Sequence, residues 1–449
     1  RADTLLGALA NAYQNNPQLN SQRAVVRATD EQVPQALSGY KPSISATATV
    51  GEQYSSTLTK GVGLTGAPVY TRNSNLVANP TVGITATQNL FDGFQTANRV
   101  RQAETNTSAA REALRVAEQT ILSQAATAYM DLLRDSALLE LQRRNVEVLQ
   151  EQLRQTRDRF NVGEVTRTDV AQTEAQLAQG RATVLAAESQ YARSRAVYRQ
   201  AIGVEAGALQ AGAPVDRLVP PRLAEAIEIA RARHPSVGVA MFGIDAALLQ
   251  VKITEGTLYP QARLVGGATQ SWEPIPGQEV QLFNAFVQGQ VTIPIYNAGP
   301  NGPADTYSAI RQAKEAVGQK RMDLDTARDL AQANVVTSWG ALDAAKAQIL
   351  ATQAQVASSE IALNGIREEA RVGQRTTFDI LVAQQNLVNA RTALVTAQHD
   401  RVVASYNLLA AVGELNLPKL GIDLPLYDPM VHYQQVRDAW FGVRTPDGR

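Results

Sequence analysis

The sequence of 449 residues contains no cysteine, and this absence excludes several kinds of chemistry. Disulfides, thiolate nucleophiles and zinc–thiolate centres all require this residue. The three histidines, His234, His399 and His432, are scattered and lack the spacing of a metal site. We therefore expect no metal, no cofactor and no lipid anchor on an N-terminal cysteine.

The chain also lacks a charge imbalance and long apolar runs. Its 42 Lys and Arg residues are balanced by 42 Asp and Glu residues, which argues against a nucleic-acid partner. No apolar run approaches the roughly 18–20 residues of a spanning helix, so we expect no membrane-spanning helix. There is no Gly-rich phosphate loop and no Ser/His/Asp constellation, so we expect no enzyme. The sequence shows no signal peptide at Arg1, and a mature exported protein would look the same.

Aromatic residues make up only 5% of the chain, whereas alanine and glutamine are frequent. A large globular core normally contains more bulky side chains. Alanine and glutamine instead suit long helices that pack closely side by side. The composition therefore favours long helices over a compact globular fold.

The most informative feature present is an internal repeat. Val162-Gly163-Glu164-Val165-Thr166-Arg167-Thr168-Asp169 recurs 210 residues later as Val372-Gly373-Gln374-Arg375-Thr376-Thr377-Phe378-Asp379. Around these motifs, residues 129–203 align with 339–413 without a gap. Such self-similarity indicates a duplicated architecture. Each motif lies between two long helical patterns, so we expect it at the tip of a helical hairpin.

The duplication predicts two similar repeats, 1–203 and 222–413, joined by a bridge over 204–221 and followed by an extension over 414–449. The elements predicted for the first repeat are a helix over 4–37, strands over 43–53 and 81–91, and a helical hairpin over 95–202. Those predicted for the second are a helix over 222–255, strands over 261–271 and 283–293, and a helical hairpin over 304–412.

Two periodicities support these elements. Apolar residues alternate with small hydroxyl residues along Ser43–Val50 and Thr81–Thr87, which predicts strands with one apolar face. A soluble sandwich would alternate in the same way. Polar loops are expected over 54–79 and 272–281. In the hairpins large apolar residues recur every seven positions, which predicts left-handed supercoiling. The first series is Leu132, Leu139, Val146, Leu153 and Phe160, and the second is Leu342, Ile349, Val356, Leu363 and Ala370.

Four strands cannot close a membrane barrel, because such barrels have at least eight. Several protomers could together close a barrel of strands and a tube of helices. The residues themselves do not choose between two protomers and three. A soluble coiled-coil periplasmic scaffold or adaptor is the alternative, although its β-domain would usually contain bulkier core residues.

The chain resembles the TolC-like outer-membrane channel-tunnel family over nearly its whole length. The most specific elements are the two tip motifs and the turn Gln88-Asn89-Leu90-Phe91-Asp92-Gly93, matched by Ile293-Pro294-Ile295-Tyr296-Asn297-Ala298-Gly299. The resemblance implies a mixed α and β membrane protein that forms a homotrimer. Its twelve strands would cross the outer membrane of a Gram-negative bacterium among the lipids, and its coiled-coil hairpins would form a periplasmic helical barrel.

The resemblance also implies a function. The trimer would be a passive exit duct that docks with a periplasmic adaptor and an inner-membrane ABC or proton-driven translocase. Its cargo would be proteins, by type I secretion, or drugs. The lack of a lipid-anchored cysteine fits the protein-secretion branch slightly better than the lipoprotein branch.

The same resemblance assigns a periplasmic gate to the tips, with Arg375 reaching Thr168 and Asp169, and Asp379 in an acidic ring. Two departures from the family pattern, Ala370 and Val382, imply a weaker closing network. Adaptor docking is implied for the tip residues Val162, Gly163, Thr166, Val372, Gly373 and Thr376. The residues alone allow a simpler interpretation of several of these positions. The threonines and aspartates would cap returning helices, and the glycines would end the preceding ones.

Overall fold

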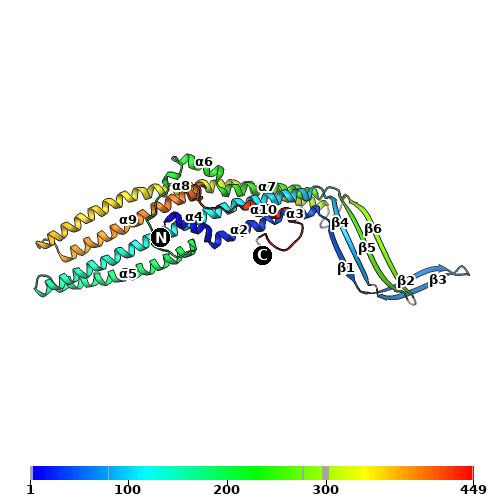
Figure 1. Cartoon of the computed structure of the whole chain (residues 1–449), viewed down its shortest axis with the longest axis horizontal. Coiled ribbons are helices and arrows are strands. Elements are labelled where there is room, and N and C mark those ends of the chain that lie inside the picture. The colour runs from blue at the N-terminus through cyan, green and yellow to red at the C-terminus, as the bar shows by residue number, and fades with distance from the viewer. Residues whose placement is uncertain (1–3, 79, 276–277, 296–302, 447, 449) are drawn as a thin grey trace. The chain divides into compact units, whose positions relative to one another are not determined.

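The computed structural model describes residues 4–78, 80–275, 278–295, 303–446 and 448 (Figure 1). The chain forms two compact units. Unit 1 contains residues 1–28, 108–242 and 321–430, and unit 2 contains 29–107, 243–320 and 431–449. Each unit thus combines segments from both predicted repeats. The boundaries 1–203, 204–221, 222–413 and 414–449 stay a prediction about sequence repeats.

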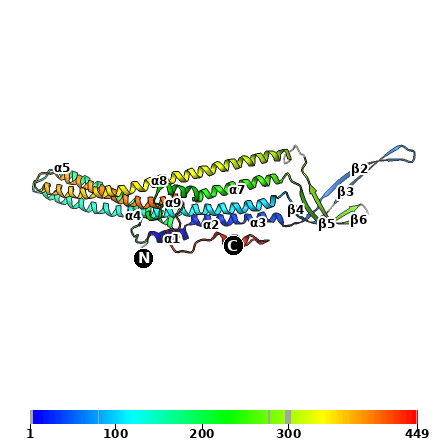
Figure 2. The same cartoon turned by 90° about the horizontal axis from the view of Figure 1, so that it is seen from above.

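Long helices dominate the chain. In chain order they are α1 (Leu5–Asn15), α2 (Pro17–Asp30), α3 (Gln32–Leu37), α4 (Gln95–Asn161), α5 (Arg167–Ile202), α6 (Leu223–Arg233), α7 (Pro235–Gly256), α8 (Pro303–Arg371), α9 (Thr377–Val412) and α10 (Pro429–Val436). Short 3-10 turns cover Ser38–Tyr40 and Asp216–Leu218. Figure 2 shows that the α4–α5 and α8–α9 hairpins have their tips at the same end of unit 1.

The core of unit 1 is built where helices from both repeats meet. Tyr129 of α4, Tyr198 of α5 and Tyr406 of α9 are almost completely buried in one apolar cluster. Closer to the tips, Leu381 of α9 packs with Leu149 and other leucines of the first hairpin. The two hairpins are therefore held together by apolar contacts at separate levels, each of which excludes water from large side chains.

Two of the predicted helices are divided by proline. The segment 4–37 forms α1, α2 and α3 instead of one helix, and 222–255 forms α6 and α7. Pro17 cannot donate to the preceding turn. The side chain of Asn16 caps the helix that follows by accepting from the N–H groups of Gln18 at 2.8 Å and Leu19 at 3.2 Å.

One segment corrects the expectation that nothing in the chain resembles a spanning helix. Leu223–Gly256 satisfies the length and composition criteria, because an 18-residue stretch within it has a mean hydropathy of 1.5. Helices that pack along other helices satisfy the same criteria. The result is therefore weak evidence for a helical span.

Unit 2 contains an antiparallel sheet in the order β1-β4-β5-β6. Its strands are β1 (Ser43–Thr49), β4 (Thr81–Phe91), β5 (Gln261–Ile275) and β6 (Gln278–Thr292). One face carries aligned rows of apolar residues, of which Ile44, Ala86, Gly266 and Val287 form one and Ala46, Ile84, Ala268 and Ala285 another. The opposite face is rich in hydroxyl groups between β1 and β4, where Ser45 lies opposite Thr85.

The loop predicted over 54–79 is wrong, because most of it is a β-hairpin. Its strands are β2 (Glu52–Val62) and β3 (Pro68–Ala78), so the predicted strand 43–53 ends early at Thr49. On one face, Thr57 lies opposite Asn73 and Thr59 opposite Thr71. This polar composition resembles a loop, although β-branched threonine suits a strand. The loop predicted over 272–281 is also shorter, since β5 reaches Ile275 and β6 begins at Gln278. Residues 276–277 lie outside the described residues, as does the turn motif from Tyr296 onwards.

Candidate functional site at the hairpin tips

The first tip begins where α4 ends and the chain turns. Gly163 has a φ of 80°, a left-handed conformation that glycine adopts without steric cost. Its N–H donates to the carbonyl of Phe160 at 3.0 Å, and the N–H of Glu164 donates to that of Arg159 at 2.9 Å. These two bonds satisfy carbonyls that a helix end otherwise leaves free.

The returning helix α5 starts with a capping box. The Thr166 hydroxyl accepts from the N–H of Asp169 at 3.2 Å, and the Asp169 carboxylate accepts from the N–H of Thr166 at 2.9 Å. Asp169 therefore has a defined structural role within the protomer. Thr168, one residue earlier, is exposed and takes no part in the capping box.

The second tip repeats this construction. Gly373 has a φ of 81°, and Thr376 and Asp379 form the capping box of α9. The Asp379 carboxylate accepts from both the N–H and the hydroxyl of Thr376, each at 2.9 Å. The backbone N–H, followed by the hydroxyl, lowers the pKa of Asp379 below its ordinary value. The prediction that these threonines are N-caps and these glycines end helices is confirmed.

The arginines at the tips bind glutamates of their own hairpins. Arg375 Nε lies 2.8 Å from Glu369 Oε2, and Arg159 Nε lies 3.0 Å from Glu164 Oε2. The Glu369 carboxylate raises the pKa of Arg375. Within one protomer, Arg375 thus forms an ion pair with Glu369 and not with Thr168 or Asp169. The link to those two residues stays a prediction.

Apolar side chains are exposed at both tips. Val162 is 73% exposed and Val372 is 71% exposed. By contrast, Ala370 is buried against Ile380 in the seam between α8 and α9, whereas Val382 of α9 is 42% exposed. The tips therefore combine capped turns with exposed valine side chains.

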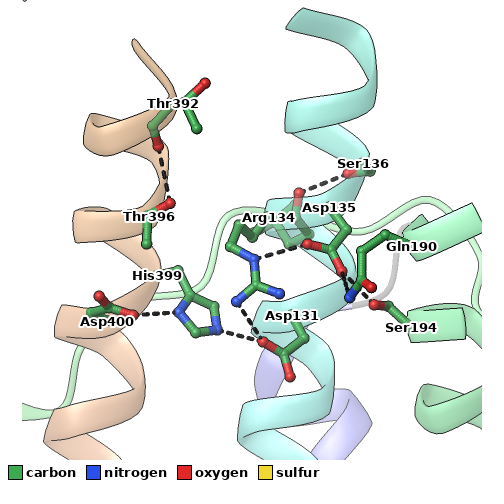
Figure 3. Close-up of polar contacts among 11 residues, drawn as sticks. Asp131, Arg134, Asp135, Ser136, Gln190, Ser194, Thr392, Thr396, His399 and Asp400 are labelled. Carbon is green, nitrogen blue, oxygen red and sulfur yellow. Dashed lines mark hydrogen bonds and ion pairs between the residues drawn. The ribbon is translucent and has the colours of Figure 1, made fainter. Parts of the chain in front are cut away.

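The sequence analysis missed a partly buried polar cluster away from the tips (Figure 3). His399 of α9 contacts Asp131 of α4 through Nε2 at 2.8 Å and Asp400 through Nδ1 at 2.8 Å. Arg134 Nη1 lies 2.9 Å from Asp131, and its Nε donates to Asp135 at 2.8 Å. No group of residues suited to a metal occurs among those that the structure describes. Only the spacing of Asp131, Arg134 and Asp135 within one helical turn could have signalled the cluster.

The sequence and fold were compared with those of known proteins. A family model described as "Outer membrane efflux protein" matches residues 8–204 and 226–414. The outer membrane efflux protein BepC of Brucella suis biovar 1 is 40% identical over 449 residues, which cover all of this chain and 93% of BepC. The outer membrane protein TolC of Vibrio cholerae is 27% identical over 429 residues, covering 92% of each chain.

Solved structures agree at the level of the fold. A structure of CusC, reported with transmembrane channel formation, superposes with a TM-score of 0.74 at 18% identity, covering 91% of this chain and 92% of that chain. The family model matches most of the chain, and the alignment with BepC covers the whole of this chain. The chain therefore belongs to the outer membrane efflux protein family and is located in the outer membrane.

Proposed function

We propose that the chain is one of three identical protomers of a passive exit duct through the outer membrane. The duct would receive drugs or proteins from an inner-membrane translocase through a periplasmic adaptor. The observation that carries this proposal is the four-stranded sheet of unit 2, which has two exposed faces and two free edges.

The sheet has a composition suited to lipid on one side and water on the other. Ile44 is 71% exposed, Val287 is 78% exposed and Phe283 is 65% exposed, all on the apolar face. A face of this kind is stable when hydrocarbon covers it. The other face carries the paired hydroxyl residues Thr49 and Thr81, which suit a water-filled lumen.

The free edges of the sheet, at β1 and β6, could pair with further copies of the same sheet. Within the described part of the chain, β1 pairs only with β4, and β6 only with β5. Unpaired backbone groups are very costly in hydrocarbon, so membrane sheets close into barrels of at least eight strands. Three copies would supply twelve strands and pair every edge. Exposed apolar residues on α8, such as Leu350 and Ile361, would be covered in the same assembly.

The tips would form the periplasmic end of the duct. In the trimer, Arg375 would exchange Glu369 for Thr168 and Asp169, and three copies of Asp379 would surround the opening. Acidic rings favour cations at narrow openings. The exposed Val162 and Val372, with the capped turns at Gly163, Thr166, Gly373 and Thr376, would offer the adaptor a rigid surface.

Single-channel conductance in planar bilayers tests this proposal. Purified parent protein should give a small, stable conductance, and Arg375→Ser should increase it because the link that closes the tip is lost. Arg159→Ser is the matched control, since it removes the corresponding ion pair at the first tip, to Glu164. The control should conduct like the parent.

The outcomes distinguish the proposed gate at the tips from the proposed duct. Equal conductance in parent and Arg375→Ser would contradict the gate but leave the duct. No conductance from any variant, together with a protein that stays monodisperse without detergent, would overturn the duct and favour a soluble scaffold.

A further inference from the structure

One polar cluster joins the two hairpins, and we call it the clasp: Asp131, Arg134 and Asp135 of α4 with His399 and Asp400 of α9 (Figure 3). It extends to a third helix, because Asp135 accepts hydrogen bonds from Ser194 and from Gln190 (3.1 Å) of α5. The side chains of His399 and Asp135 are buried, at 8% and 3% exposed, whereas Asp131 is 31% exposed and Asp400 is 56% exposed. The clasp therefore links α5, α4 and α9 across the unit.

The geometry favours a charged His399. Both ring nitrogens lie 2.8 Å from a carboxylate oxygen, Nδ1 in a hydrogen bond with Asp400 and Nε2 in an ion-pair contact with Asp131, and only the imidazolium carries a hydrogen on each nitrogen. A neutral ring would direct one lone pair at a carboxylate. It would also leave three carboxylates in the clasp against a single cation, Arg134.

Burial lowers the pKa of His399, but the bonds to Asp131 and Asp400 raise it, and the net direction is upward. Arg134 opposes this increase through its positive charge. Arg401, the next charge on α9, is directed to Asp216 at 3.1 Å. On α5 the residues that contact the clasp, Gln190 and Ser194, are uncharged.

We infer that His399 is a positioning residue that holds the second hairpin against the first when it is protonated and releases it when it is not. This inference rests on the proposed function, because it supplies a control for the opening of the tips. A group whose pKa is raised by folding contributes stability below its unfolded pKa and loses it as the pH rises through the folded value. The clasp should therefore be closed in acid and loosen as the pH rises above the ordinary histidine pKa of about 6.5.

Two direct contacts between the hairpins lie on either side of the clasp and report on it. On the tip side, Gln176 of α5 donates to Gln385 of α9 at 3.0 Å. On the side away from the tips, Ser123 of α4 donates to Asn407 of α9 at 2.6 Å. Loosening of the clasp should separate the first pair more than the second, because the large apolar cluster around Tyr406 holds the helices together near Asn407, whereas only the small cluster around Leu381 lies near Gln385.

Cross-linking tests the inference, and the cysteine-free chain gives it no background. One variant carries Gln176→Cys with Gln385→Cys, and the other carries Ser123→Cys with Asn407→Cys. Each purified full-length protein is treated with a bifunctional methanethiosulfonate reagent from about pH 5 to about pH 9, on both sides of the ordinary histidine value. The cross-linking yield of the Gln176/Gln385 pair is divided by that of the Ser123/Asn407 pair. This ratio removes most of the pH dependence of the thiols, because the thiols of both variants react faster as the pH rises.

In the parent background this ratio should fall several-fold as the pH rises, whereas in His399→Gln it should not change with pH. Asp131→Asn should move the fall to lower pH, because it removes one of the carboxylates that favour the imidazolium. His432→Gln is the matched control, since His432 also contacts a buried carboxylate, that of Asp30 at 3.1 Å. It should follow the parent.

A parent-like pH profile in His399→Gln, or an unshifted one in Asp131→Asn, would overturn the inference. The readout does not depend on conduction. A pH-dependent ratio in a protein that never conducts would therefore contradict the duct but not the clasp, and a flat ratio in a conducting protein would do the reverse.

Discussion

The two returning helices, α5 and α9, have the same length and the same ends but very different surroundings. Each has 36 residues, begins with a Thr/Asp capping box and ends at a left-handed glycine, Gly203 or Gly413. Six positions of α5 are buried, compared with sixteen of α9. Figure 1 shows the reason, because α9 lies between α8 and α4, whereas α5 borders the unit.

The sequence explains this difference in burial between α5 and α9 at equivalent positions. Leu408 of α9 and Tyr198 of α5 are 210 residues apart, and both are buried in the seam of their own hairpin. α9 has a second buried stripe, formed by Leu381, Val388, Val402, Ser405 and Leu409. The matching residues of α5 are exposed: Ala171, Ala178, Ala192, Arg195 and Arg199. Local motifs thus determine where a helix starts and stops, whereas the second stripe determines what it packs against.

The comparison extends to the outgoing helices. Asp131, Arg134 and Asp135 of α4 correspond to Ala341, Ala344 and Ala345 of α8. Where α4 carries the clasp, the small residues of α8 line an open groove of about 550 Å³ beside α9. The two repeats have therefore diverged at these positions: the first has polar contacts there, and the second has an open groove.

Truncation at one pair of equivalent positions should give the largest contrast. Leu409→Ala removes a fully buried side chain and should lower the free energy of unfolding by about 2–5 kcal/mol. Arg199→Ala removes only an exposed ion pair to Glu205 and should cost less than about 1 kcal/mol. Guanidinium unfolding followed by circular dichroism measures both. Similar costs would mean that α5 is as enclosed as α9.

The clasp aspartate offers a second contrast. Asp135→Ala leaves Ser194, Gln190 and Arg134 without their common acceptor and should cost about 3 kcal/mol. Asp343→Ala removes an exposed carboxylate of α8, with a side chain 61% exposed, and should be nearly neutral. The same unfolding assay applies. A neutral Asp135→Ala would show that the clasp adds little to the junction.

At the tips the two hairpins should behave alike, because their backbones are alike. Gly163→Val and Gly373→Val place a β-branched residue at a φ near 80° and should each cost about 1–3 kcal/mol locally. Hydrogen exchange in the last turns of α4 and α8 measures the effect. A clear difference between the tips would indicate that one of them is held by contacts beyond its own turn.

The smallest effect is expected from acid. The pKa of Asp379 is lowered in the folded state, so its contribution to the cap is present above its ordinary pKa of about 4 and is lost as the pH falls through the folded value. Asp379→Asn should remove this dependence. Amide exchange of Thr376 and Asp379 in the parent and the variant, followed below about pH 4, measures it. Identical acid profiles would contradict the assignment.

Sequence reasoning succeeded where the determinants are local. The tip glycines, the capping residues and the alternation in β1 and β4 act within a few residues, so their patterns could be interpreted directly. It failed for β2 and β3, whose Thr, Ser and Asn side chains resemble a loop until the strands are paired. The clasp could not be predicted, because Asp131 and His399 meet only when two distant helices pack together.

The measurement that tests the account most directly is the mass of the purified assembly by native mass spectrometry from detergent. The proposed trimer predicts one species at three times the protomer mass of 48.3 kDa, in which the free sheet edges and the exposed surface of α5 are covered. A uniform monomer of 48.3 kDa that needs no detergent would contradict the account, since neither the sheet edges nor its apolar face would then be covered.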